Sequence, residues 1–385
     1  MKIKTTTAYS ILACLALISH LFSIVGLPMG YHRLVSFSVM LTTVISALAL
    51  MLIFVERDQS VDRMNDFTIF VILVATIVLS LLVNKTGFSS WKKILTFLQL
   101  PAFLFAANRS FNSKMRDVIY VTNGFYPILF WYFYNAPFAH RYEGEYGFVN
   151  HKNITLGFSN PNEAALYIMI CAIIVLAAVF HYKAIPIKVL FAGEFALLLF
   201  LLNQSGSRAA ILMTFAILLI VLLVKKISLN AKKIRILIFI PLIVPLVLYC
   251  FPQLGDYLLM KETIDNGRGE LVADFVKEIN LGFFLLGDFK QYPLINWHNA
   301  PLSIMAAFGT ITLITYWVYM YRGYKKLCIM TVEDGESKTL LLGAMVIIVY
   351  SAVESALMVS GAVFALSGYL LLFLLGSGKR QTIEE

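Results

Sequence analysis

The sequence predicts an all-α polytopic membrane protein with about 12 transmembrane helices. Of its 385 residues, 59% are hydrophobic and only 14% are charged, and the mean hydropathy is +0.80. This apolar surplus exceeds what the core of a soluble protein holds. Apolar stretches long enough to cross a hydrocarbon layer of about 30 Å recur from end to end. We therefore expect one integral membrane domain over residues 1–385, without a soluble domain.

The predicted spans follow one another with mostly short connections. Their limits are residues 8–26, 34–55, 67–83, 94–107, 117–137, 162–181, 187–202, 209–224, 234–252, 299–321, 339–356 and 359–376. The first span follows Met-Lys-Ile-Lys and lacks a cleavage site of small residues. It is expected to be a retained helix rather than a removed signal peptide.

Basic residues gather on the connections that alternating spans place on one side. They include Lys225, Lys226, Lys232, Lys233, Arg235, Arg322, Lys325, Lys326, Lys379 and Arg380. Because cytoplasmic loops are enriched in Lys and Arg, this side is predicted to be cytoplasmic, and both termini with it. The net charge of +9 is then a signal of topology and not of nucleic-acid binding.

Two predicted outer connections are long, residues 138–161 and 253–298. Long loops without a soluble core are uncommon unless they act as lids or binding loops. In the second loop, apolar residues recur at helical spacing over 271–279, which predicts an amphipathic helix on the membrane surface. Arg268 falls in or beside its first turn, where free N–H groups and the helix dipole favour an anion.

Arg208 lies at the predicted outer mouth of the eighth span, in "NQSGSRAAIL". A guanidinium at that depth is costly unless it reaches the interface or meets an anion. Its neighbours Asn203, Gln204, Ser205 and Ser207 form a polar turn between two apolar helices. These polar neighbours favour a functional role for Arg208 over that of an interfacial anchor.

Two other polar strings have structural explanations that compete with functional ones. In "GFSNPNEAALYI", Ser159 or Asn160 can cap a helix that has Pro161 at its first position, with Asn162 next. His298 and Asn299 precede the tenth span. A lone interfacial His is more often structural than catalytic, although its ordinary pKa of about 6.5 suits proton transfer. Asn299 is a plausible helix cap.

Glu354 lies near the predicted outer end of the eleventh span. An ionisable group there is by default a candidate for function. If the turn after this span comes earlier, Glu354 is merely exposed.

In chain order, "GFSNPNEAALYI", "SGSRAAIL", "NGRGELVADFVKEI" and "WHNAPLSIMAAFGTI" resemble motifs of the bacterial O-antigen ligase and Wzy-type polysaccharide polymerase family. The resemblance covers roughly residues 150–310 by motif and the remainder only by hydropathy. It implies a GT-C-like glycosyltransferase acting on oligosaccharides carried by undecaprenyl diphosphate, at the outer face of the bacterial cytoplasmic membrane.

On the matching positions, the resemblance implies catalytic roles for three residues. Arg208 and Arg268 would hold the lipid diphosphate, and His298 would position or deprotonate the acceptor hydroxyl. Substrate-binding roles are expected for Asn160, Asn162, Glu270, Asn299 and Glu354.

These residue types suit a transfer that needs neither a metal nor a cofactor. Arginine forks compensate the charge that develops on a diphosphate leaving group, and a neutral imidazole can accept the hydroxyl proton. The first predicted outer loop, "LPMGYHRL", has no Asp or Glu, which oxygen-ligand cation sites generally need. Direct attack on an axial diphosphate would invert the anomeric centre.

Three functions stay open at this point. A polymerase of repeat units for capsule, exopolysaccharide or O-antigen is expected first, with a flippase and a chain-length regulator as partners. A ligase shares the chemistry, but the modest outer loop leaves less room for docking a bulky second acceptor. A lipid-linked oligosaccharide flippase also has about 12 spans, yet it predicts ionisable residues near the midplane, whereas the candidates here gather toward one side.

Overall fold

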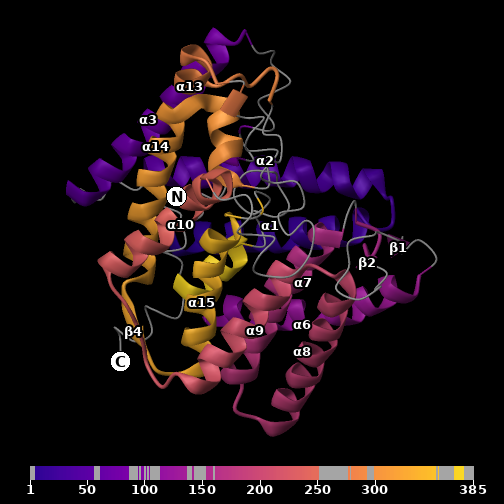
Figure 1. Ribbon diagram of the computed structural model, residues 1–385. Helices are drawn as coiled ribbons and strands as arrows, with labels where there is room; N and C mark the ends of the chain where they lie inside the picture. The colour runs from indigo at the N-terminus through magenta and orange to yellow at the C-terminus, as the bar shows by residue number, and fades with distance from the viewer. Residues whose placement is uncertain are drawn as a thin grey trace.

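The computed structural model describes residues 5–55, 61–85, 94, 97, 98, 101, 104, 113–136, 141, 142, 153–158, 161–250, 276, 277, 279–292, 299–352, 354 and 368–376. Over these residues the chain is helical apart from two small antiparallel sheets, which confirms the all-α class (Figure 1). The predicted span 94–107 and the first part of 359–376 lie largely outside this set.

The observed helices follow the predicted spans closely. They are α1 (Thr5–Gly26), α2 (His32–Val55), α3 (Val61–Val83), α6 (Ser113–Asn135), α7 (Pro161–His181), α8 (Ile185–Ser205), α9 (Arg208–Leu223), α10 (Ala231–Cys250), α13 (Leu281–Leu286), α14 (Ala300–Cys328) and α15 (Gly335–Tyr350), and residues 368–376 are also helical. The sheets pair β1 (Arg141–Tyr142) with β2 (Asn153–Ile154), and β3 (Ile227–Leu229) with β4 (Met330–Val332). The largest differences are the end of α14, seven residues late, and the start of α3 and the end of α15, each six residues early.

By length and composition, three helices, α7, α8 and α14, could cross a membrane, where α14 is counted as one helix across its interruption at Gly309. In α7, residues 164–178 are all buried, as expected for a helix that is apolar on every side. By contrast, α8 and α9 expose large apolar side chains, such as Ile185, Leu212 and Leu223 at 74%, 68% and 76%. Soluble proteins rarely expose such extended apolar surface, so these helices suggest a membrane protein.

Helix directions follow from contacts at one end of the molecule. Lys338, near the start of α15, donates to the carbonyls of Val221 and Val224 at the end of α9. His181, the last residue of α7, contacts Glu336 at the start of α15. The pairing of β3 with β4 lies at this same end, which we call the β3–β4 end. The starts of α7 and α9 therefore lie at the opposite end, with the last turn of α15.

Helix α14 is two helical segments and not the single span predicted over 299–321. At Gly309 the backbone has φ 81° and ψ 175°, which interrupts the helix. The indole of Trp317 donates to Ile238 at 2.8 Å, and the amide of Asn299 donates to Pro241 at 3.0 Å. These two acceptors are about 4.5 Å apart along α10, whereas residues 299 and 317 would be about 27 Å apart in a straight helix. The chain therefore turns back at Gly309, and we call residues 300–308 the half-helix.

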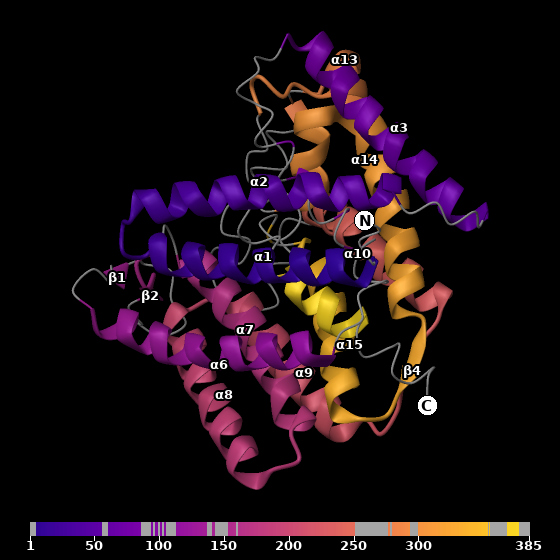
Figure 2. The ribbon, with the colours of Figure 1, turned by 180° about the vertical axis from the view of Figure 1, so that it is seen from behind.

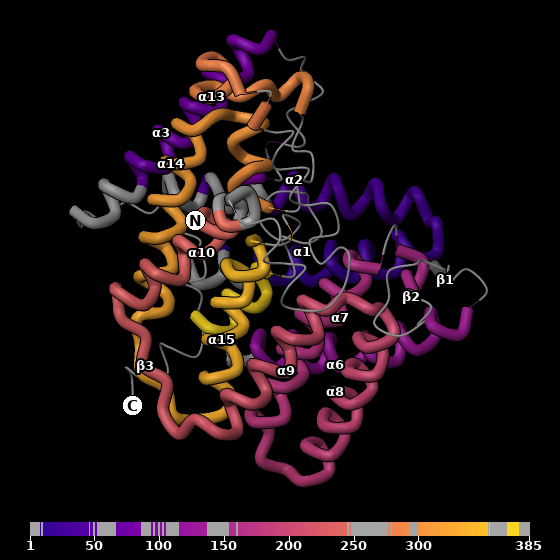
Figure 3. Tube along the Cα trace, in the orientation of Figure 1, coloured from indigo at the N-terminus to yellow at the C-terminus, as the bar shows by residue number. Residues whose placement is uncertain are grey.

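Close contact between two glycines explains the turn. A Cβ atom at Gly309 would lie 2.1 Å from the carbonyl oxygen of Leu285, and one at Gly287 would lie 2.5 Å from the amide of Phe308. Both glycines have positive φ, a region that L-residues with side chains rarely adopt. The segment around α13 thus packs directly on the backbone of the turn, which can be followed in Figure 3.

The N-terminal helices cover another face of the molecule. Figure 2 shows α1, α2 and α6 side by side, running across the direction of α14. A buried cluster of hydroxyl groups joins α1 to α2, with Ser19 bonded to Ser38 and Thr42.

Candidate functional site

Asn299 is buried and joins three parts of the chain through one amide. Its Oδ1 accepts the amide proton of Leu302 at 3.0 Å, which confirms the predicted helix cap. Its Nδ2 donates to the carbonyls of Pro241 in α10 and Ala352 after α15, each at 3.0 Å. Both donors and the capping acceptor are therefore engaged, so the amide holds the half-helix in place, and this geometry adds nothing to its expected role in binding substrate.

The prolines of α10 explain why Asn299 finds an acceptor there. Proline has no N–H, so Pro245 cannot make the helical hydrogen bond to the carbonyl of Pro241, four residues earlier. That carbonyl is buried inside the bundle and would otherwise lack a helical donor. The amide of Asn299 provides the missing donor. The sequence "IPLIVP" thus marks a docking point for the half-helix.

The end of α15 lies at the same junction. The amide of Ala300 donates to Ser351 at 2.9 Å, and the amide of Glu354 donates to Tyr350 at 2.9 Å. The turn after α15 comes earlier than predicted, at residues 351 and 352. The expected consequence, an exposed Glu354, is wrong: the residue is 6% exposed. The Asn299 junction, defined as Pro241, Asn299, Ala300, Ser351, Ala352 and Glu354, is thus buried and polar.

Arg208 and Asn162 begin two helices at the end of the bundle opposite β3–β4. Arg208 is the first residue of α9, after a tight turn in which Gly206 has φ 69°. Asn162 is the second residue of α7, and Pro161 is its first, as predicted. Both side chains are partly buried. The structure therefore places Arg208, Asn162 and the end of α15 with Glu354 at one end of the molecule.

Four of the predicted site residues, Asn160, Arg268, Glu270 and His298, lie outside the described residues. The same holds for most of the predicted surface helix at 271–279, in which residues 276 and 277 are described and helical.

Two ionisable side chains inside apolar helices were missed by the sequence reasoning. Glu194 lies in the middle of α8, and its buried Oε2 has no hydrogen-bond partner among the described residues. His20 of α1 is 3% exposed, with its Nδ1 3.2 Å from the hydroxyl of Tyr126. The signal for Glu194 was present, since "VLFAGEFALLLF" contains one charge in an apolar run. Neither residue fits the expectation that ionisable groups gather on one side of the protein.

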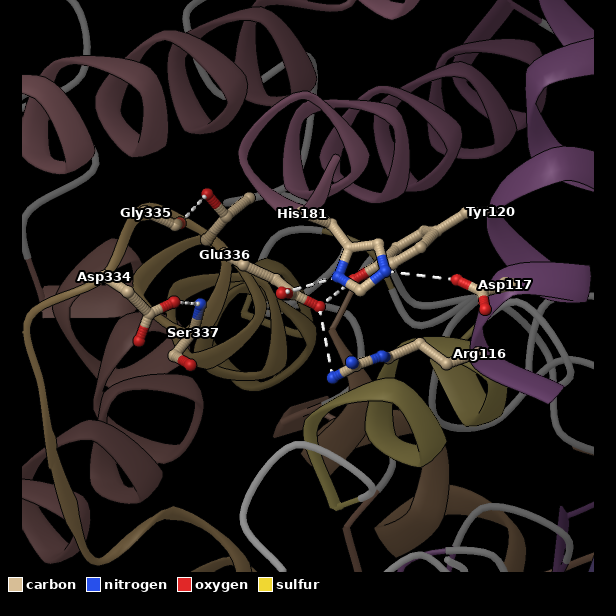
Figure 4. A network of polar contacts seen from close by, with 9 residues as sticks. Arg116, Asp117, Tyr120, His181, Asp334, Gly335, Glu336 and Ser337 are labelled. Carbon is tan, nitrogen blue, oxygen red and sulfur yellow. Dashed lines mark hydrogen bonds and ion pairs between the residues drawn. The ribbon is translucent and has the colours of Figure 1, made fainter. Parts of the chain in front are cut away.

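A second polar cluster joins three helices at the β3–β4 end (Figure 4). His181 of α7 lies 2.9 Å from Glu336 through Nδ1 and 3.1 Å from Asp117 of α6 through Nε2. Tyr120 donates to Glu336 at 2.7 Å, and Arg116 lies 3.5 Å from the same carboxylate. Because each ring nitrogen faces a carboxylate oxygen, this geometry favours the doubly protonated imidazolium. These five residues form the His181 cluster.

Interactions within the cluster set the ionisation of Glu336. Burial by itself raises the pKa of this carboxyl, but the hydrogen bonds from His181 and Tyr120 and the charge of Arg116 oppose it and hold the pKa below its ordinary value. Nothing in the sequence brings these residues together, since they come from helices that are far apart in the chain.

Comparison with known proteins adds no family. No protein-family model matches the chain, and no curated protein or solved structure shows a significant match. Among the described residues, no group of three or more His, Cys, Asp or Glu side chains is placed to hold a metal ion.

Proposed function

We propose that the protein is a membrane-embedded glycosyltransferase that joins oligosaccharide repeat units carried on undecaprenyl diphosphate, at the outer face of the bacterial cytoplasmic membrane. The observation that carries the proposal is the shared end of the bundle. Residues 162, 208 and 354 are distant in sequence, yet the starts of α7 and α9 and the turn after α15 lie at the same end of the bundle. A one-sided group of polar helix ends suits a reaction at one membrane surface.

Arg208 is the described cation at this end that the proposal assigns to the diphosphate. A guanidinium offers two parallel donors to phosphate oxygens, and its charge is permanent. By the motif resemblance, Arg268 adds a second cation. The leaving group gains negative charge as its bond to the anomeric carbon breaks, so the two arginines lower the barrier by stabilising that charge.

The acceptor side of the reaction is assigned to residue 298. The acceptor hydroxyl attacks the anomeric carbon, the bond to the diphosphate breaks, and undecaprenyl diphosphate leaves with the electron pair. The hydroxyl proton passes to the imidazole of His298. Asn299 supports this role indirectly, because its three hydrogen bonds fix the position of the residue that follows His298 in the sequence.

Arg208→Ala tests this assignment directly. The purified protein in lipid nanodiscs is given its lipid-linked repeat unit with a chelator present, and glycan ladders are resolved on gels. Loss of an arginine that stabilises the leaving group should slow chain growth by about 10²- to 10³-fold. Arg322→Ala, near the end of α14 toward β4, is the matched control and should leave the rate unchanged.

The outcomes separate the alternatives. Ladders from the repeat unit alone support a polymerase, and product only after addition of a second acceptor supports a ligase. Wild-type chain growth from Arg208→Ala would remove this residue from the mechanism, and no glycosyl transfer under either condition would contradict the enzyme.

A second candidate, a flippase for lipid-linked oligosaccharides, is favoured by separate observations. Glu194 and His20 lie within apolar helices, and α14 is broken, features that are typical of secondary transporters. Liposomes carrying fluorescent lipid-linked oligosaccharide distinguish the two functions. The flippase is supported if the wild-type protein moves the label across the bilayer without forming new glycosidic bonds and Glu194→Gln does not. This result would contradict the glycosyltransferase.

A further inference from the structure

A cavity of about 540 Å³ opens beside the end of α3 and α13. This volume falls in the range of small-molecule sites. Its polar lining comes from Asn84, Asn280, Asp288 and Gln291, and its aromatic lining from Phe283 and Tyr292. The cavity is separate from the Asn299 junction: Gly287, which lines it, contacts the far end of the half-helix at Phe308. The half-helix spans about 14 Å between the two.

The walls of this cavity are held in place from two sides. Ser80 of α3 donates to the carbonyl of Leu286 at 2.6 Å, and Asn84 donates to that of Gly287 at 3.2 Å. The amide of Asp288 donates to Ala306 of the half-helix at 2.8 Å. A pocket whose loop is bonded to two helices is largely preformed, which lowers the entropy cost of binding.

The charge of the described lining disfavours a phosphate ligand. Among the described lining residues there is no Lys, Arg or His, and the one carboxylate is Asp288. A diphosphate would meet repulsion from this carboxylate and no compensating cation. The described lining therefore suits a neutral or cationic ligand better than the lipid diphosphate.

Several polar atoms of the lining have hydrogen-bonding capacity left. Asp288 accepts the amide proton of Gln291 with Oδ1 at 3.0 Å, and the side chain of Gln291 donates to Tyr292 at 2.8 Å. Within the described part of the chain, the other carboxylate oxygen of Asp288, Oε1 of Gln291 and Nδ2 of Asn280 have no partner. Two acceptors and one donor beside an aromatic wall match a ligand whose hydroxyl groups both donate and accept.

We propose that this cavity binds a neutral sugar of the acceptor glycan, with Asp288 and Gln291 accepting hydrogen bonds from its hydroxyl groups. The choice of a glycan among polyhydroxyl ligands rests on the proposed function. A glycan seated here would extend along the half-helix toward Asn299, the residue that follows His298 in the sequence. The cavity would then select the acceptor by its sugar hydroxyls, independently of the lipid diphosphate.

Saturation-transfer NMR tests the proposal with the full chain in nanodiscs. The probes are maltose, lactose and N,N′-diacetylchitobiose, each with and without inorganic pyrophosphate. We expect transfer to at least one disaccharide, undisturbed by pyrophosphate. Asp288→Ala should weaken that binding by about 10-fold or more, because it removes a charged acceptor. Lys290→Ala, an exposed neighbour outside the lining, is the matched control and should bind as the wild type does.

The results that overturn the proposal are distinct from those that overturn the function. Absence of transfer to all three disaccharides, displacement by pyrophosphate, or unchanged binding in Asp288→Ala would each overturn the sugar site. Arg208→Ala should keep disaccharide binding while it loses chain growth. Disaccharide binding by a wild-type protein that makes no glycan would leave the sugar site standing and contradict the transferase.

Discussion

Asn299 is the residue on which the central junction depends most. Its amide donates to the carbonyl of Pro241 in α10, which has no helical donor because residue 245 is proline, and to the carbonyl of Ala352 in the turn after α15. It also accepts the amide proton of Leu302 in the first turn of the half-helix. A single amide can do this because it carries two donors and an acceptor on one planar group. Aspartate has nearly the same size as asparagine, but its ionised side chain can only accept hydrogen bonds and has no donor.

Asn299→Asp should therefore destabilise the protein although the cap is retained. The carbonyls of Pro241 and Ala352 would lose their donor, at about 1–3 kcal/mol for each buried group. Asn299→Ala loses the cap as well, which adds about 1 kcal/mol. Thermal unfolding followed by size-exclusion chromatography should rank wild type above both variants.

Asn203→Asp serves as the control for this ranking. Asn203 is exposed in the last turn of α8, so the same chemical change there should leave the melting temperature nearly unchanged. A wild-type melting temperature for Asn299→Ala would show that the junction does not depend on this amide.

At the scale of the element, the turn within α14 depends on one backbone conformation. Gly309→Ala would place a Cβ atom 2.1 Å from the carbonyl oxygen of Leu285, at a φ of 81°. Neither backbone segment can move without breaking the packing of α13 on α14, so we expect a loss of at least about 2–3 kcal/mol. The readout is the yield and melting temperature of folded protein in detergent.

Gly193→Ala is the matched glycine for this comparison. It lies in the middle of α8 with nothing within 4 Å of an added Cβ atom, so alanine should be neutral or slightly stabilising there. Equal yields and melting temperatures of Gly309→Ala and Gly193→Ala would contradict the view that the turn within α14 requires glycine at residue 309.

Features set by nearby residues could be predicted from the sequence, whereas features set by distant contacts could not. Helix limits follow hydropathy, which is local, and the starts of α7 and α9 were predicted to within a residue. The reversal at Gly309 was not predictable, because it depends on contact with Leu285, 24 residues away. The cap formed by Asn299 was predictable from its neighbours, whereas its bonds to Pro241 and Ala352 were not.

For the molecule as a whole, alternating spans predicted that Asn162, Arg208 and Glu354 share one end, and the helix directions agree. The polar groups of the interior and of the other end escaped prediction. Glu194 was one charge in an apolar run, and His181 has carboxylate partners from two other helices. Clusters built from three helices leave no periodic signal in a single sequence.

The His181 cluster ties α6, α7 and α15 together at the β3–β4 end, so its ionisation should control the stability of the whole bundle. The pKa of Glu336 is lowered in the folded protein from its ordinary value of 4.5. A carboxyl with a depressed pKa stabilises the fold at pH values above its unfolded pKa, and this contribution is lost as the pH falls through the folded pKa. We therefore expect the wild-type melting temperature to decrease as the pH is lowered below about 4.5.

Glu336→Gln isolates this contribution. The amide can still accept from Tyr120, but Arg116 and His181 lose their counter-charge, at about 3 kcal/mol near neutral pH for a largely buried pair. The difference in melting temperature between wild type and Glu336→Gln should then become smaller as the pH drops toward 3, because protonation of Glu336 removes the same charge from the wild type. Glu333→Gln is the control: its pair with Lys226 is more than half exposed, so the expected change is at most about 1 kcal/mol. Parallel melting curves of wild type and Glu336→Gln across this pH range would contradict a role for the Glu336 charge in holding the three helices together.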